Sequence, residues 1–175
     1  MEQWVSPEVK FSGRIFTVRA GGITLDDGTP AYREVVEHPG GVCVLPFDGT
    51  HVTLVRQYRI AVGEEVLEAV AGKLEPGDDP AHRARLELEE EAGIRADTLV
   101  EAGTIFGCVG FCSERIFLFL ALDLHYGIAR PEAEEQIELV KLHLDEVKQL
   151  LDNHTIKDAK TIVLLERLLR RNEQC

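Results

Sequence analysis

Residues 72–94 read GKLEPGDDPAHRARLELEEEAGI and contain the clearest structural signals in the chain. The first residues of this stretch are rich in Gly and Pro, which predicts a loop. Helix signals follow, because Asp79 is a favourable N-cap and Pro80 suits the first helical turn. Gly93 suits the position just past the C-terminal end of a helix. The stretch therefore predicts a loop followed by a helix.

Three glutamates lie on one face of this predicted helix. Glu87, Glu90 and Glu91 are three or four residues apart, and side chains at that spacing are neighbours on a helix. Two carboxylates about 4 Å apart repel by roughly 4 kcal/mol at an effective dielectric constant near 20, so something must offset the repulsion. Solvent together with Arg83 and Arg85 is one explanation. A hard divalent cation bound by oxygen ligands is the other.

The charge of the chain is concentrated around this helix. The 175 residues, of which 45% are hydrophobic and 29% are charged, suit one soluble globular domain. Residues 63–92 carry ten acids and three bases, and residues 131–138 carry four acids and no base. Eleven of the twelve excess negative charges therefore lie in two short segments. So acidic a chain is poorly suited to nucleic acids or anionic membranes, and we expect neither as a partner.

The remaining composition predicts a cytoplasmic protein. The N-terminal residues lack the basic start and apolar run of a signal peptide, and no apolar stretch reaches the length of a membrane span. The four cysteines form no CxxC pair, so we expect reduced thiols. They are Cys43, Cys108, Cys112 and Cys175.

Strand and turn patterns flank the acidic helix on both sides. Apolar runs or alternation predict strands, with tight turns at residues 27–28 and 48–49. The predicted strands cover residues 13–19, 31–37, 41–46, 51–57, 65–70, 99–104, 116–122 and 137–142, and two further helices cover 144–151 and 159–171. A mixed sheet with few helices packed on it predicts an α/β (α+β) sandwich. The first strand pair predicts a small N-terminal antiparallel β lobe over residues 1–38.

The opening stretch resembles the Nudix box, G-x5-E-x7-R-E-U-x-E-E-x-G-U, in which U is a bulky aliphatic residue. Seven of the nine fixed positions match at the correct spacing, and they are Gly72, Glu87, Leu88, Glu90, Glu91, Gly93 and Ile94. Asp78 stands at the first glutamate position and Leu86 at the arginine position. The motif favours the cation over the solvated face as the explanation of the clustered glutamates.

The resemblance extends to the branch of ADP-ribose pyrophosphatases and nucleoside diphosphate sugar hydrolases, and covers roughly residues 12–170. The segments that carry it are Arg33-Glu34, residues 55–59 (VRQYR), residues 68–72 (EAVAG), Gly110-Phe111 with Ser113-Glu114, and residues 158–161 (DAKT). It implies a Nudix-type α-β-α sandwich over residues 39–175. It also implies an intertwined homodimer in which the N-terminal lobe helps to build the partner's site.

The resemblance further implies hydrolysis of the diphosphate in ADP-ribose or a related nucleoside diphosphate sugar, giving a nucleoside monophosphate and a sugar phosphate. An acidic segment would repel this anion, and Mg²⁺ or Mn²⁺ would resolve the conflict by bridging carboxylate and phosphate oxygens. Glu87, Glu90 and Glu91 are the implied metal-binding side chains, of which Glu87 and Glu90 are also counted as catalytic. The Ala71 carbonyl is a further implied ligand, and Gly72 would let the chain turn close to the cations.

The resemblance places the general base on a late loop outside the box. Glu135 is the preferred candidate, because residues 135–138 (EQIE) fit the Glu-x-I-Glu strand entry of the family. Glu132 and Glu134 are alternatives, as is a loop whose glutamates are all merely solvated.

Cationic side chains are expected to contact the phosphates or a ribose. The candidate substrate-binding residues are Arg33, Arg56, Arg59, Glu68 and Phe111. Structural salt bridges with Glu34 or Glu37 are the alternative for the arginines. Phe16 or Tyr32 could stack on a base, but an ordinary core or hairpin role is the favoured interpretation.

Leu86 is the main departure from the motif, because the family's arginine orients the glutamates and leucine has neither charge nor donor. Arg83, four residues before Glu87, is a partial substitute. We predict reduced but real hydrolysis, which Leu86→Arg should raise. The alternatives are a weakened domain that binds or senses ADP-ribose-like nucleotides, and a GDP-mannose or ADP-glucose pyrophosphatase.

Overall fold

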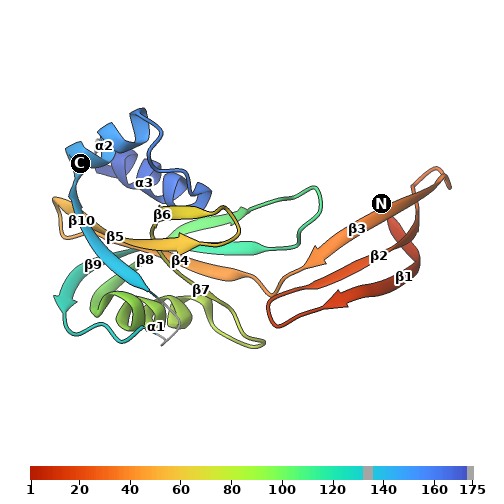
Figure 1. Cartoon of the computed structure of the whole chain (residues 1–175), viewed down its shortest axis with the longest axis horizontal. Helices are drawn as coiled ribbons and strands as arrows, with labels where there is room; N and C mark the ends of the chain where they lie inside the picture. Colours follow the sequence, from red (N-terminus) through yellow and green to blue (C-terminus); the bar gives the residue numbers. More distant parts are fainter. Residues whose placement is uncertain (132–135, 173–175) are drawn as a thin grey trace. The chain divides into compact units, whose positions relative to one another are not determined.

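The computed structural model describes residues 1–131 and 136–172, and over these residues the chain forms ten strands and three helices (Figure 1). The chain divides into two compact units. The first combines Met1–Gly40 with Phe106–Arg115, and the second combines Gly41–Ile105 with Ile116–Cys175.

The first unit is a three-stranded antiparallel sheet in the order β1-β2-β3, drawn in red to orange in Figure 1. Its strands are β1 (Gln3–Ser12), β2 (Thr17–Thr24) and β3 (Pro30–Glu37). The segment Phe106–Arg115 joins this sheet at Val36, whose backbone exchanges two hydrogen bonds with it: the Val36 N–H donates to the Phe111 carbonyl at 2.7 Å, and the Ser113 N–H donates to the Val36 carbonyl at 2.9 Å.

The sequence does not predict strand β1. It predicts a strand over residues 13–19 instead, which partly covers the turn before β2. All ten residues of β1 are exposed, so no buried face imposes a clear apolar alternation. Pro7 is tolerated because β1 is an edge strand, and the register shifts at two points along it. Pairing with β2 therefore defines the strand.

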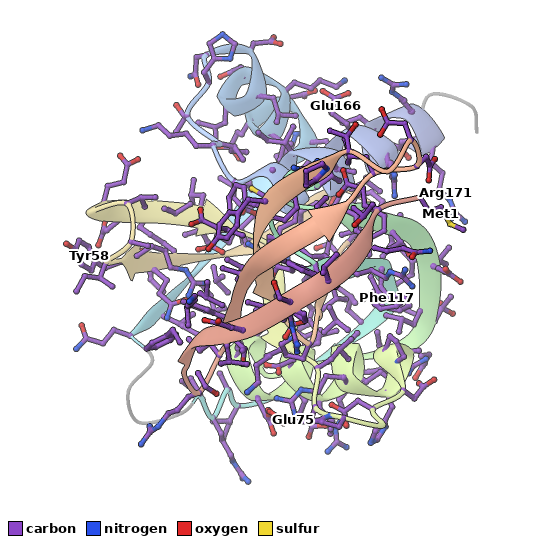
Figure 2. All side chains as sticks on the ribbon, turned by 90° about the vertical axis from the view of Figure 1, so that its right-hand side faces the viewer. Met1, Tyr58, Glu75, Phe117, Glu166 and Arg171 are labelled. Atoms are coloured by element: carbon purple, nitrogen blue, oxygen red, sulfur yellow. The ribbon has the colours of Figure 1, made fainter. Side chains whose placement is uncertain are left out.

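The second unit contains two further sheets, in the orders β7-β4-β9-β8 and β10-β5-β6. Their strands are β4 (Gly41–Pro46), β5 (His51–Arg59), β6 (Glu64–Glu68), β7 (Val70–Lys73), β8 (Ile94–Phe106), β9 (Arg115–Tyr126) and β10 (Ile137–His143). The helices are α1 (Pro80–Ala92), α2 (Leu144–Asp152) and α3 (Ala159–Asn172). Strand β4 runs parallel to β9 and antiparallel to β7, so the sheet is mixed, as predicted. Exposed side chains such as Tyr58 lie along the β5–β6 hairpin (Figure 2).

Strand β4 shows the layering of this unit, because all six of its residues are buried. Val42 and Val44 belong to the apolar cluster that includes Ala84 and Leu88 of α1. Cys43 and Leu45, which point the other way, belong to the cluster formed with Leu164, Leu165 and Leu168 of α3. Helices thus cover both faces of β4, which confirms the predicted α-β-α sandwich.

The single strand predicted over residues 65–70 is two strands in different sheets. Strand β6 ends at Glu68 and β7 begins at Val70, so the break falls at Ala69. The Ala69 N–H donates to the Thr161 hydroxyl at 2.7 Å instead of to a neighbouring strand. A contact with a distant helix therefore ends the strand, and local alternation contains no sign of it.

None of the helices in the described part of the chain is long and apolar enough to cross a membrane. The three cysteines within that part, Cys43, Cys108 and Cys112, are free thiols.

Candidate active site

Helix α1 begins and ends where its sequence predicts. The Asp79 carboxylate caps the helix by accepting from the His82 N–H at 2.8 Å, and Pro80 occupies the first turn. Gly93 adopts the left-handed conformation at φ 64°, which suits glycine. Its N–H donates to backbone carbonyls of Leu88 and Glu89 in the last turn of the helix. These local signals place the acidic residues of the helix at fixed positions.

The three predicted metal-binding glutamates differ in burial. Glu87 and Glu91 lie one helical turn apart, and each retains only 7% of its accessible surface. Glu90 is exposed and lines a cavity of about 880 Å³ together with Leu86, Gly93 and Arg130. The structure therefore presents a buried carboxylate pair and one more solvated carboxylate, where the helix pattern alone treats all three alike.

Gly72 is required by the position of Glu87. A Cβ at residue 72 would overlap the carboxylate of Glu87, so the side chain packs directly against the bare backbone of β7. Ala71 precedes this contact and pairs with Cys43 of β4. The backbone around the predicted carbonyl ligand is consequently adjacent to the first buried glutamate.

Arg83 supplies a cation beside Glu87, although the motif position of arginine is taken by Leu86. One of its terminal nitrogens lies 2.6 Å from a Glu87 carboxylate oxygen, so the predicted i to i+4 contact is present. The Nε of Arg83 is buried without a hydrogen-bond partner among the described residues. Leu86 faces the cavity that Glu90 lines, so its side chain lies on another side of the helix.

Arg59 and Glu68 form a part-buried ion pair. The Arg59 Nε donates to one Glu68 carboxylate oxygen at 2.6 Å, and an Nη donates to the other at 3.0 Å. Hydrogen bonding to Glu68 raises the pKa of Arg59, burial opposes this change, and the charge of Glu91 adds to it. Burial alone would raise the pKa of Glu68, but Arg59 and Lys160 outweigh it and lower that pKa.

The other predicted substrate contacts are spread over both units. Arg56 donates across strands to Glu138 at 2.8 Å. Arg33 lies in the first unit and pairs with Glu2, so the alternative of a Glu34 or Glu37 bridge is wrong for this arginine.

The three aromatic residues considered as substrate contacts all lie in the first unit. Phe111 is exposed on the segment Phe106–Arg115. Phe16 packs on Phe11 with ring centroids 5.7 Å apart, which fits a hairpin role, and Tyr32 is exposed on β3.

The predicted base, Glu135, and its alternatives Glu132 and Glu134 lie outside the described residues. The segment just before them is anchored to α1. The Gly127 N–H donates to the Gly93 carbonyl at 2.6 Å, and the Arg130 N–H donates to the Glu90 carbonyl at 2.8 Å.

The residues present fit a hard divalent cation in donor chemistry. Among the residues that the structure describes, no group of three His, Cys, Asp or Glu side chains is close enough to hold a metal. A magnesium-type ion, however, is usually bound by one or two carboxylates and completes its shell with water and substrate phosphates. Glu87 and Glu91 are two such carboxylates, both buried on one face of α1, and Glu87 lies against the backbone of Gly72.

Sequence reasoning assigned no role to three residues that adjoin this site, Asp158, Lys160 and Thr161. Lys160 lies 2.6 Å from Glu68 and 2.9 Å from Asp158. The Asp158 carboxylate accepts from the Thr161 N–H at 3.0 Å, which is N-cap geometry for α3. The Asp-x-x-Thr spacing in residues 158–161 is the signal that could have indicated this cap.

The chain belongs to the Nudix family, since the NUDIX domain model matches residues 37–165. Two curated relatives are similar over 170 residues, which is 95% of this chain and 92% of each relative. An ADP-ribose pyrophosphatase of Bacillus subtilis (strain 168) is 32% identical, and a methanol dehydrogenase activator of Bacillus methanolicus is 33% identical. The crystal structure of an ADP compounds hydrolase has the same fold, with a TM-score of 0.86 over 99% of this chain and 95% of that chain, at 21% identity.

Proposed function

We propose that this Nudix pyrophosphatase hydrolyses the diphosphate of ADP-ribose or a related nucleoside diphosphate sugar to a nucleoside monophosphate and a sugar phosphate. The observation that carries the proposal is that Glu87 and Glu91, one helical turn apart, are both buried, and that Glu87 packs against the bare backbone at Gly72. The name of the Bacillus subtilis relative supports ADP-ribose as the first substrate to test.

Glu87, Glu91 and the Ala71 carbonyl would hold Mg²⁺ or Mn²⁺, and Glu90 would add its charge from the exposed side. The bound cation would supply Lewis-acid stabilisation of the charge that develops on the phosphate oxygens. Arg83 would keep the Glu87 carboxylate oriented, since the two groups are 2.6 Å apart. This ion pair supports hydrolysis despite Leu86, in preference to a domain that only binds nucleotides.

The protein side chains would position the substrate and move the proton. Arg59 presents a guanidinium fork, which matches phosphate oxygens in geometry and charge. Arg56, Arg33, Glu68 and Phe111 remain candidate contacts. Glu135 remains the proposed base that deprotonates the attacking water, with Glu132 and Glu134 as its alternatives.

A homodimer is part of the proposal. The first unit has few buried apolar side chains, and among the residues described they are Ala20 and Ile23. Val5, Val9 and Phe11 of β1 are exposed, and a small sheet of this kind needs a further apolar surface to be stable. A second copy of the chain would provide that surface.

Location in the cytoplasm, which the cysteine usage favours, also stays a prediction.

The test is a substrate panel. Purified protein is incubated with ADP-ribose, ADP-glucose and GDP-mannose, with and without Mg²⁺ or Mn²⁺, and the released nucleoside monophosphate is quantified. We expect cation-dependent release of AMP from ADP-ribose. Preferred release of GMP from GDP-mannose would identify GDP-mannose, in place of ADP-ribose, as the substrate. Tight binding without any product would favour the sensor, and absence of both binding and product would overturn the proposal.

A further inference from the structure

The start of α3 packs against the end of β6 next to the proposed site, and Figure 1 shows the two elements beside one another. Four charged side chains meet there: Arg59, Glu68, Lys160 and Asp158. Lys160 lies between the two carboxylates, 2.6 Å from Glu68 and 2.9 Å from Asp158. With Arg59 on the other side of Glu68, the four charges sum to zero.

The four groups differ in their access to solvent. The Lys160 side chain is 15% exposed and that of Glu68 only 4%, whereas 43% of the Arg59 side chain is exposed. Burial alone would lower the pKa of Lys160, but the charges of Asp158 and Glu68 outweigh it and raise that pKa, so the lysine stays cationic. Arg59 is therefore the member of this cluster best placed to meet an anion from solution.

Lys160 also makes it possible for Arg59 to interact with a second anion. A buried carboxylate that loses its cation is strongly destabilised. Glu68 has two independent cationic partners, and one of them is the less exposed Lys160. A phosphate can therefore compete for the Arg59 guanidinium without leaving Glu68 as an unpaired buried charge.

The same turn of α3 holds the backbone that leads into β7. The Thr161 hydroxyl accepts from the Ala69 N–H at 2.7 Å and donates to Asp158 at 2.5 Å. Ala69 is fully buried and lies two residues before Ala71. The contacts of Asp158, Lys160 and Thr161 thus reach both Arg59 and the strand that carries the proposed carbonyl ligand.

We propose that Lys160 is a positioning residue: with Asp158 and Thr161 it holds Glu68 and Ala69, so that Arg59 is presented to the substrate diphosphate. The inference rests on the proposed function. It gives Glu68 the role of a support for Arg59, and it predicts that Lys160 acts on substrate binding through Arg59.

The experiment is a double-mutant cycle in which Lys160→Met and Arg59→Ala are made singly and together. Lys157→Met is the matched control, because Lys157 pairs with Glu64 at 3.0 Å on the same approach to α3 but is largely exposed. KM and kcat for ADP-ribose are measured at saturating Mg²⁺. Amide hydrogen exchange over residues 68–73 provides a readout that needs no activity.

We expect Lys160→Met to raise KM about tenfold in the wild-type background, which corresponds to about 1.4 kcal/mol, and less than about twofold beside Arg59→Ala. Exchange over residues 68–73 should accelerate, and Lys157→Met should change neither quantity. Equal losses in both backgrounds, or no loss in the wild-type background, would overturn the inference.

Two further variants cover the case in which Lys160→Met does not fold. Lys160→Arg keeps a cation beside Glu68. In this variant Arg59→Ala should therefore raise KM by the same factor as it does in the wild type. Thr161→Val removes the hydroxyl and should accelerate exchange at Ala69; unchanged exchange there overturns the inference. Wild-type hydrolysis is measured first, because its absence contradicts the proposed function, whereas additive losses in an active enzyme contradict only the role of Lys160.

Discussion

At Gly72 the backbone of β7 lies so close to the Glu87 carboxylate that any side chain would displace it. We expect Gly72→Ala to lower kcat at least tenfold while the protein stays folded, because the carboxylate must move to admit the methyl group. Steady-state kinetics and circular dichroism measure the two effects. Gly77→Ala in the loop that follows β7 is the control, since a Cβ there meets no atom within 4 Å although its φ of 93° costs stability. Equal activity losses in both variants would contradict this account.

Arg83 is the second residue whose role is testable alone. Its pairing with Glu87 predicts that Arg83→Ala lowers kcat about tenfold, in line with the loss of one charge-assisted hydrogen bond. Arg85→Ala is the matched control, because Arg85 contacts the Ala96 carbonyl instead of a glutamate. Leu86→Arg should raise kcat at saturating Mg²⁺, and an unchanged kcat would show that Arg83 already supplies the missing cation.

The local features of the site could be predicted from the sequence, because each depends on neighbours in the chain. Asp79, Pro80 and Gly93 define α1 by capping rules that act within a few residues. The different burial of Glu90 and Glu91 depends on what packs against the helix. The spacing of residues within the helix contains no information about that packing.

The junction of β6 with α3 predicts that the stability of the protein depends on pH. Folding lowers the pKa of Glu68, so its contribution to stability is present above the ordinary glutamate pKa of about 4.3 and is lost as the pH falls through the lower folded value. We therefore expect the free energies of unfolding of the wild type and Glu68→Gln to converge between pH 6 and about pH 3. Urea titrations across this range measure both, and a constant difference would contradict the assignment.

Two features of the strands, β1 and the break at Ala69, could not be predicted from the sequence, and the reason is the same for both. Strand β1 pairs with β2 without burying a face, and the break at Ala69 results from a hydrogen bond to Thr161, which is 92 residues away. Both depend on partners that are distant or that leave no apolar pattern. Strand β4 was predicted correctly because burial on both faces makes it a continuous apolar run.

At the scale of the whole molecule, the exposed apolar side chains of β1 predict self-association. We expect sedimentation to give twice the 19.5 kDa mass of one chain. Val9→Lys should shift the equilibrium toward the monomer, because it places a charge on a surface that the partner would cover. Lys10→Ala is the control at the adjacent exposed position. A fully active monomer would contradict the proposed dimer.

Only part of the excess negative charge of the chain belongs to the proposed cation site. Two of its carboxylates, Glu87 and Glu91, are buried, and Glu87 lies against Gly72. Others are neutralised locally, as Glu89 is by Arg95 and Glu68 by Arg59 and Lys160. Composition locates the acidic segments, but three-dimensional pairing decides which carboxylates remain for a cation.

Two glutamates of helix α1 provide a direct test of the proposed cation site. Glu91 is buried and is a proposed cation ligand, whereas Glu89 is partly exposed and paired with Arg95 at 2.5 Å. At saturating Mg²⁺, Glu91→Gln should lower kcat/KM for ADP-ribose at least a hundredfold, equivalent to about 2.7 kcal/mol, while Glu89→Gln stays within about twofold of the wild type. A Glu91→Gln variant as active as the wild type would contradict the account.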